Sequence, residues 1–264
     1  MLRTAFLAVL SLAASCAMTT SVPEPIRAEM APGGVLRAGI NLGNPTVVQK
    51  DPAGGPLRGV GPELARELAK RLGARLEFVT YDSAAKMADA VSQGAWDVAF
   101  LAVDPKRSDI IGFSAPYMEI QASYMVRDDS PIKGFGDVDR KGVRIATNNN
   151  AAFDLWMQRN LKNAERVPFA NSPEAVERFL ARKDLDAVAG VRNPLVAAAA
   201  KHPGYRVLEG SFASVGQAAG VPRNREASTG YLREFIEEMK RSGFIAKALK
   251  DSAVTEATVA PAAS

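Results

Sequence analysis

Several residue types that carry chemistry are scarce in this chain of 264 residues. It has a single cysteine, Cys16, and a single histidine, His202, so no His/Cys/carboxylate cluster suits a transition metal. No glycine-rich phosphate loop is present, because Gly54-Gly55 lies in a proline-containing turn and lacks a following Lys-Ser/Thr. His202 lies in a Lys-His-Pro-Gly segment that we expect to be solvent-exposed, so it is not expected to form a hydrolase triad with Ser114 or Ser123. The sequence therefore predicts no cofactor, no metal and no enzyme.

The excess of positive over negative charge is also small. The formal net charge is only +4, from 33 Lys and Arg against 29 Asp and Glu, and the basic residues form no run. Nucleic-acid binding would need clustered Lys and Arg with interleaved aromatic residues. We therefore expect no nucleic-acid partner.

The chain has no apolar run long enough to span a bilayer. Residues 5–14 are apolar, follow the positive Arg3 and precede small residues, which is typical of a secretory leader covering residues 1–17. Cys16 follows Ala-Ala-Ser, which resembles a bacterial lipobox with Ala where Leu is usual. Two alternatives stay open, a lipid anchor at Cys16 or an ordinary leader cut nearby. Either one predicts a periplasmic protein whose membrane contact is at most that anchor.

Both ends of the exported chain have few hydrophobic repeats. Residues 18–33 are rich in Pro and small residues, so we predict a flexible tether there. Residues 251–264 are predicted to form a disordered tail.

Between these ends one unit occurs twice. Ser83 is the predicted N-cap of a helix that leads through a turn to a buried strand with Asp97 at its start. Ser172, the predicted cap of a second such helix, and Asp186 recur at the same spacing. Each copy follows a predicted strand, at 75–81 and near Val167. A helix over 62–72, ended by a glycine, lies between the first two strands. Two strand-helix-strand-helix-strand copies predict an α/β protein with two parallel-sheet lobes.

The residues also resemble a known family, the bacterial extracellular solute-binding proteins, family 3, which serve polar amino-acid ABC transporters. The similarity spans residues 34–250 and is carried by the order and spacing of short motifs. These are LRAGINLGNP (36–45), GVGPELARELAKRLGARLEFVTYDS (59–83), WDVAF (96–100), PKRSDIIGFSAPY (105–117), DSPIKGFGDVDRKGVRIA (129–146) and LDAVAG (185–190).

The resemblance implies a two-lobed periplasmic-binding-protein-like (type II) fold. Lobe 1 would hold residues 34–126 and 216–250, and lobe 2 residues 127–215. Two crossover segments, near 123–127 and 214–217, would form a two-segment hinge. A ligand would lie in the cleft between the lobes and be buried when the hinge closes. The implied partner is an ABC-transporter permease, and the protein is expected to bind it as a monomer.

Arg107 is the first candidate for ligand binding, because the family uses an Arg at this place to clamp the ligand carboxylate through two parallel hydrogen bonds. Lobe 2 would add Asn149, Asn150 and Ala151, where the family offers backbone N–H groups at a helix start. Asn44 in the polar turn after the first strand is a further candidate.

Three departures from the family concern the ligand's amino group. The segment between Asp97 and Arg107 is about two residues short, Phe100 and Ala102 replace a Ser/Thr pair, and Val191 stands where the family has an acidic residue. An ammonium buried without a carboxylate would cost several kcal/mol. A common amino acid is therefore not the expected ligand.

These departures affect how three further candidate residues are interpreted. Asp104 either replaces the lost acid or, as we prefer, caps the turn at Pro105 or pairs with Arg107. Arg192 either adds a second cation to the cleft or points to solvent, and Phe100 offers an apolar wall or is core.

The predicted function is capture of a small carboxylate-bearing solute, amino-acid-like or an organic anion, for an ABC transporter. Two alternatives stay open. One is a periplasmic enzyme of the cyclohexadienyl dehydratase kind on the same fold, which would need a general acid in the cleft. The other is a sensory binding protein without a transporter.

Overall fold

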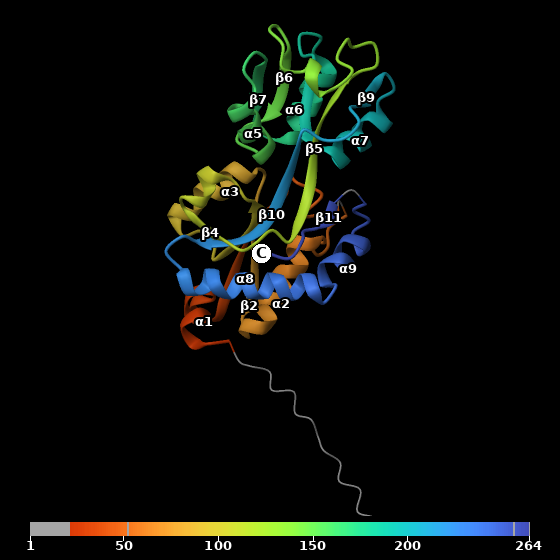
Figure 1. Ribbon diagram of the computed structural model, residues 1–264. Helices are drawn as coiled ribbons and strands as arrows, with labels where there is room; N and C mark the ends of the chain where they lie inside the picture. The colour runs from red at the N-terminus through yellow and green to blue at the C-terminus, as the bar shows by residue number, and fades with distance from the viewer. Residues whose placement is uncertain (1–21, 52, 256, 264) are drawn as a thin grey trace, which may run out of the picture.

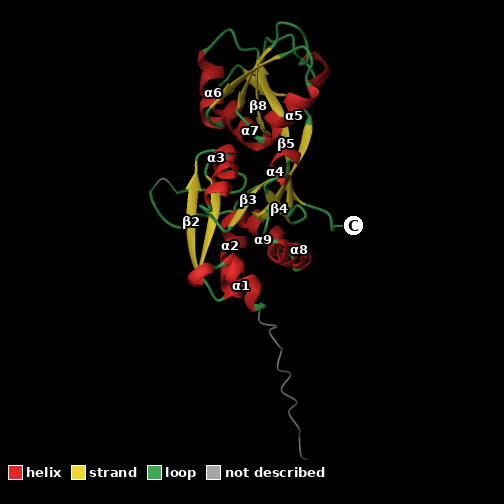
Figure 2. Cartoon of the chain, turned by 90° about the vertical axis from the view of Figure 1, so that its left-hand side faces the viewer, coloured by secondary structure: helices red, strands yellow, loops and turns green. Residues whose placement is uncertain are grey.

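The computed structural model describes residues 22–51, 53–255 and 257–263. The predicted leader with Cys16 lies outside these residues, as do the first four residues of the predicted tether. Figure 1 shows two lobes, one above the other, connected by two long neighbouring strands. Figure 2 shows the same division from the side, with helices packed on the strands of each lobe. The predicted two-lobed α/β fold is thereby confirmed.

Lobe 1 contains both ends of the described chain. Its strands are β1 (Val35–Asn41), β2 (Arg75–Tyr81), β3 (Val98–Ala102), β4 (Ile111–Phe113) and β11 (Ala257–Val259). Its helices are α1 (Glu24–Met30), η1 (Pro32–Gly34), α2 (Val60–Leu72), α3 (Ala84–Asp89), η2 (Ala90–Gln93), α4 (Pro105–Ser108), α8 (Glu226–Arg241) and α9 (Phe244–Asp251).

Lobe 2 is formed by the middle of the chain. Its strands are β6 (Arg144–Asn148), β7 (Glu165–Phe169), β8 (Ala187–Val191) and β9 (Tyr205–Val207). Its helices are η3 (Phe135–Asp137), α5 (Ala152–Asn160), α6 (Ser172–Ala181) and α7 (Arg192–Lys201).

Two long strands, β5 (Met118–Arg127) and β10 (Ala213–Pro222), run from one lobe into the other. They pair antiparallel with each other between Ala213↔Ala122 and Gln217↔Met118. Beyond that stretch β5 pairs with β8 of lobe 2, whereas β10 pairs with β3 and β4 of lobe 1. The strand order is β2-β1-β3-β10-β5-β8-β6-β7, so one sheet path crosses both lobes through this pair. The residue boundaries between the lobes stay a prediction.

The repeated unit of the sequence has the same structure in both lobes. In lobe 1, β1 lies between β2 and β3 in parallel, and in lobe 2, β6 lies between β7 and β8 in parallel. Asp97 accepts a hydrogen bond from the backbone N–H of Arg37 at 3.1 Å, and Asp186 accepts one from that of Arg144 at 2.8 Å. Each aspartate thus joins the start of one strand to its neighbour.

The helix predicted over 62–72 forms as α2 but begins two residues earlier. Leu64, Leu68 and Leu72 are buried against the sheet, as their four-residue spacing predicts. Gly73 ends the helix in the left-handed conformation, with φ of 62°, which a residue without a Cβ adopts at low cost.

The two predicted irregular ends are wrong where the structure describes them. Within the predicted tether, α1 packs on α8, Met30 is fully buried, and the Ser228 hydroxyl donates to the Glu29 carboxylate. Within the predicted tail, β11 pairs antiparallel with β5 between Ala257↔Ile120 and Val259↔Met118. Both segments are too short for a sequence period to show, and tertiary packing decides their structure.

The predicted cap of the second repeat helix is also wrong by one residue. Asn171, not Ser172, is the N-cap of α6, and its side chain accepts a hydrogen bond from the N–H of Glu174 at 2.9 Å. Ser172 is then the first helical residue and its hydroxyl accepts a hydrogen bond from the Asn148 amide. In the part of the chain that the structure describes, no helix is long and apolar enough to cross a membrane.

Candidate ligand-binding cleft

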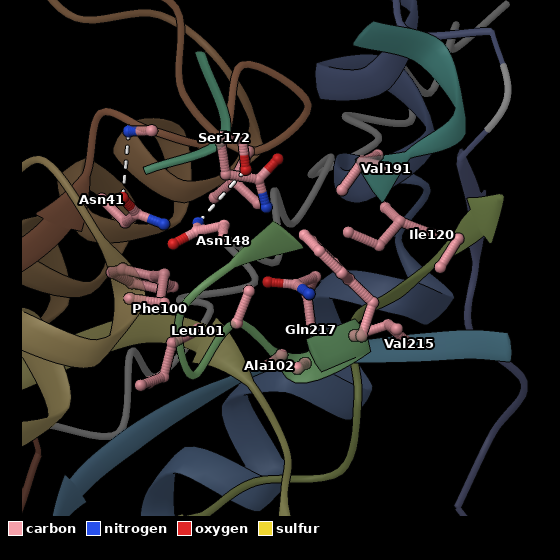
Figure 3. Close-up of a pocket in the computed structure, with 18 of the residues that line it drawn as sticks. Asn41, Phe100, Leu101, Ala102, Ile120, Asn148, Ser172, Val191, Val215 and Gln217 are labelled. Carbon is pink, nitrogen blue, oxygen red and sulfur yellow. Dashed lines mark hydrogen bonds between the residues drawn. The ribbon is translucent and has the colours of Figure 1, made fainter. Parts of the chain in front are cut away.

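A small cavity of about 40 Å³ lies between the lobes, where the carboxyl ends of the parallel strands meet the paired strands β5 and β10 (Figure 3). Both lobes line it. Lobe 1 contributes Asn41 and Arg107, lobe 2 contributes Asn148 and Ala151, and the crossing strand β10 contributes Gln217. Ligands of open α/β sheets bind at such strand ends, where loops rather than ladder hydrogen bonds decide which side chains appear.

Arg107 is the cationic group of this cleft. It lies on the short helix α4 and is only 4% exposed. One guanidinium nitrogen donates to the carbonyl of Ala102 at 2.9 Å, and the other donates across the cleft to the carbonyl of Asn150 at 2.9 Å. Burial lowers the pKa of Arg107 to about 10, because the low-dielectric surroundings disfavour its charge, although Asp104 opposes that shift. A buried cation with neutral partners is a site that an anion would stabilise.

Asp104 holds α4 in place and does not face the cavity. Its carboxylate caps the helix by accepting from the N–H of Lys106 at 3.0 Å, which agrees with the preferred interpretation of a cap before Pro105. Its second oxygen accepts from Arg159 of lobe 2 at 2.8 Å. Asp104 is 2% exposed and Arg159 is half exposed, so the pair links the lobes at the rim of the cleft.

The loop before α5 supplies a carbonyl to Arg107. Asn150 has a φ of 55°, a left-handed conformation that Asn tolerates better than most residues. Its N–H donates to the Asp154 carboxylate at 2.9 Å, and the N–H of Ala151 donates to the carbonyl of Asn148 at 3.1 Å. The N–H of Asn149 donates to the carbonyl of Phe169 at 2.9 Å, so all three backbone amides that the family resemblance assigns to the ligand are already hydrogen-bonded.

Asp154 is a positioning residue that the sequence reasoning missed. It is fully buried, and besides the N–H of Asn150 it accepts from Arg166 at 2.6 Å and from Gln158 at 2.9 Å. An acidic residue at the third helical position, after a run of Asn, is a helix-start signal that could have identified it. It fixes the loop that meets Arg107.

Five residues with side-chain amides line the cavity, Asn41, Asn44, Gln121, Asn148 and Gln217, and of these only Asn44 was a predicted site residue. Asn148 is 4% exposed, and its amide nitrogen donates to the Ser172 hydroxyl at 3.1 Å, while its carbonyl oxygen is buried with no hydrogen-bond partner. Figure 3 shows this amide between Ser172, Asn41 and Phe100. Gln217 is 2% exposed and lines the same space. Asn148 therefore offers an unused acceptor to a ligand donor.

The predicted site residues divide into two groups. Those that line the cavity are Asn44, Phe100, Arg107 and Ala151, and those that do not are Asp104, Asn149, Asn150 and Arg192. The Phe100 ring packs edge-on against Tyr117, with 6.3 Å between the ring centres, so Phe100 is both core and cleft wall. Arg192 begins α7 and Asn149 is exposed beside the loop. Their contacts with a ligand stay predictions.

The charges around the cavity are strongly one-sided. Among residues 22–51, 53–255 and 257–263, none of the side chains lining it is a carboxylate or a histidine, and Val191 occupies the family's acidic position. Over the same residues no group of three or more His, Cys, Asp or Glu side chains could hold a metal ion.

Comparisons with solved structures give the same architecture. A variant of ArgBP from T. maritima superposes with a TM-score of 0.74 at 22% identity, over 87% of this chain and 100% of that one. A cysteine-binding protein from Campylobacter jejuni gives a TM-score of 0.73 at 21% identity, over 84% and 90%. The ancestral amino acid-binding protein AncCDT-1, described as a precursor of cyclohexadienyl dehydratase, gives a TM-score of 0.70 at 24% identity, over 83% and 95%.

No curated protein matches the chain. The family profile described as bacterial extracellular solute-binding proteins, family 3, matches residues 36–251, which include lobe 2, most of lobe 1, both crossing strands and all the residues that line the cleft. Together with the repeated lobes and the buried Arg107 between them, this match shows that the chain belongs to the bacterial extracellular solute-binding proteins, family 3.

Proposed function

We propose that the protein captures a small carboxylate-bearing solute between its two lobes and delivers it to the permease of an ABC transporter. Arg107 binds the carboxylate, and closure of the lobes removes the ligand from water. The protein works as an exported monomer in the periplasm. The family supports the exported location, while the permease and the monomeric state are part of the proposal.

The observation that carries the proposal is that Arg107 is buried without a carboxylate among its hydrogen-bond partners. It is a buried guanidinium whose partners in the structure are two neutral carbonyls, and burial depresses its pKa. A carboxylate placed against it would form charge-assisted hydrogen bonds in a site already shielded from water, which are about twice as strong as neutral ones.

The same cleft argues against an ordinary α-amino acid as the ligand. An ammonium group needs acceptors, preferably a carboxylate, and the described lining offers only neutral amides. The free carbonyl oxygen of Asn148 suits a single neutral donor, such as a hydroxyl or an amide N–H. We therefore propose an organic acid, with or without a neutral donor, as the ligand class.

A second candidate function is turnover of the bound acid. The similarity to AncCDT-1 favours considering it. A dehydratase would need a general acid in the cleft. Since the side chains lining the described cleft include no carboxylate and no histidine, we propose binding without turnover.

The test is a screen of organic acids by thermal shift and calorimetry on the wild-type protein and on Arg107→Met. A ligand at one hundred times its dissociation constant stabilises the wild type by about 2.7 kcal/mol. Arg107→Met should lower the affinity for that acid at least about a hundredfold, because a desolvated charge pair is lost.

Lys106→Met is the matched control, since Lys106 is an exposed cation on the same helix. It should leave the affinity unchanged. If no carboxylate binds, or if Arg107→Met binds as tightly as the control, the proposed ligand class is wrong. Conversion of a bound prephenate or arogenate would instead support the enzymatic candidate.

A further inference from the structure

A second and much larger cavity adjoins the cleft on the lobe 2 side. Its volume is about 440 Å³, against about 40 Å³ around Arg107. It lies between α6 and α7, and residues 43–45 of lobe 1 close it from the other side. Volumes of this size are typical of small-molecule pockets, whereas the space around Arg107 equals only a few water-sized volumes.

Most of the residues in the walls of this groove are apolar. From α6, Val176 and Leu180 face it on the side that begins at Ser172, and Ala198 faces it from α7. Leu195, which belongs to the core cluster of lobe 2, forms part of its floor. Eight helical residues separate Ser172 from Leu180, so the groove extends about 12 Å away from the cleft.

Two ionisable side chains belong to the lining of the groove. Glu177 and His202 line it, and both are exposed to solvent. No described lining residue of the groove is a buried charge, so the groove suits an uncharged occupant.

The groove and the cleft adjoin each other and share part of their walls. Gly43, Asn44, Ser172 and Val191 line both cavities. Ser172 is also the residue that fixes the Asn148 amide inside the cleft. A molecule with one end at Arg107 therefore has the space between α6 and α7 directly beside it.

We propose that the groove between α6 and α7 binds the apolar tail of the carboxylate whose head lies at Arg107. The ligand class is then a monocarboxylate with an unbranched apolar tail of roughly eight to ten carbons, since each C–C bond advances an extended chain by a little less than about 1.5 Å. This inference rests on the proposed function, because Arg107 is taken to hold the head. The sizes of the two cavities support this proposal. The small cavity beside Arg107 would hold the carboxylate, and the large, mostly apolar cavity would hold the tail.

The groove also connects tail binding to lobe closure. Its lobe 2 walls come from α6, α7 and β8, whereas Gly43, Asn44 and Pro45 come from lobe 1. A tail in the groove is covered on both sides only when the lobes are together. Longer tails therefore bury more apolar surface in the closed state, and affinity should rise with tail length.

The experiment is calorimetry of the protein with the straight-chain series from butanoate to decanoate. We expect the affinity to rise about two- to fourfold with each added methylene, as burial of a CH₂ predicts. Arg107→Met should weaken every member of the series by the same factor.

Ala198→Phe tests the groove itself, because the new ring would fill the space between α6 and α7. The matched control is Ala197→Phe, since Ala197 is exposed on the neighbouring position of α7 and does not line the groove. Ala198→Phe should abolish the gain from tail length and leave butanoate binding as in the control.

The possible failures can be told apart. If affinity depends on Arg107 but is flat from butanoate to decanoate, the tail groove is wrong and the proposed function stands. The same conclusion follows if Ala198→Phe and Ala197→Phe bind decanoate equally well. If no member of the series binds while a compact organic acid binds through Arg107, the tail groove is again wrong. If no carboxylate binds at all, both proposals fall.

Discussion

The two lobes repeat one framework but use it with very different burial. Asp97 in lobe 1 and Asp186 in lobe 2 each accept a hydrogen bond from the backbone N–H of the neighbouring strand. Asp97 is fully buried and also accepts from the guanidinium groups of Arg37 and Arg225. Asp186 is half-buried, and that backbone N–H is its only side-chain hydrogen bond among the described contacts. The backbone role is shared, and the electrostatic role is particular to lobe 1.

The lobes differ more at the cleft than in the framework. Lobe 1 supplies the cation, Arg107, from a four-residue helix, whereas lobe 2 supplies the neutral Asn148 and the apolar faces of α6 and α7. Asn148 is the last residue of β6 and ends its ladder with β7, whereas Arg107, α6 and α7 lie beyond the strands. Loops at strand ends are therefore free to differ while the strands remain alike.

The sharpest test of the comparison is Asp97→Asn against Asp186→Asn. Asp97→Asn removes a buried negative charge from two arginines and should lower the free energy of unfolding by about 3 kcal/mol. Asp186→Asn keeps an oxygen for the backbone N–H and should cost less than about 1 kcal/mol. Urea unfolding would give the stability, and hydrogen exchange would assign each loss to its lobe.

The control for both changes is Asp128→Asn, at an exposed position without a side-chain hydrogen bond among the described contacts. It should leave stability within about 0.5 kcal/mol of the wild type. Equal losses for Asp97→Asn and Asp186→Asn would break the comparison, since the burial difference would then have no energetic consequence.

A gain of function would sharpen the contrast at the cleft. Val191→Asp places an acid at the N-cap of α7, where Asp is favoured and where Val191 makes no side-chain cap. Because a carboxylate would then be available to an ammonium, α-amino acids should gain at least about tenfold in affinity relative to the matching deaminated acids. Calorimetry with such pairs of ligands measures the ratio.

Val196→Asp is the matched control, as Val196 is exposed on the same helix and the change in net charge is identical. An equal ratio in both variants would mean that long-range charge rather than a local partner acts on the ligand. It would also mean that the acid missing from position 191 is not what disfavours amino acids.

Much of the fold could be predicted from the sequence because its signals are periodic. The Leu64, Leu68 and Leu72 stripe and the repeated Asp97 and Asp186 both follow from local rules of helix and strand. The segments that were predicted wrongly, α1 and β11, are short and take their structure from α8 and β5, which lie far away in the chain. Local patterns carry no information about such partners.

The candidate site was less accessible to sequence reasoning. Arg107 lies in the cleft, and the family motif around it is what indicated it. Asn148, Asp154 and Gln217 are polar residues whose burial, rather than type, makes them notable. Arg192 was a predicted site residue because it follows Val191 in the sequence. Val191 lines the cleft, but Arg192 is not among the lining residues.

The smallest expected effect concerns the link between the lobes. Arg159 of lobe 2 pairs with Asp104, which caps the helix that carries Arg107. Arg159→Met removes this contact between the lobes, so the ligand-free protein should become more open and have a larger radius of gyration in X-ray scattering. Since Arg159 is 48% exposed, the loss should be about 0.5 kcal/mol, or two- to threefold in affinity for the carboxylate.

Lys162→Met, at an exposed cation whose side chain has no ion pair among the described contacts, should change neither the radius of gyration nor the affinity. An unchanged radius of gyration in Arg159→Met would mean that the Arg107 contact with Asn150 alone holds the lobes together, and the double variant Arg107→Met/Arg159→Met would then be the one that opens.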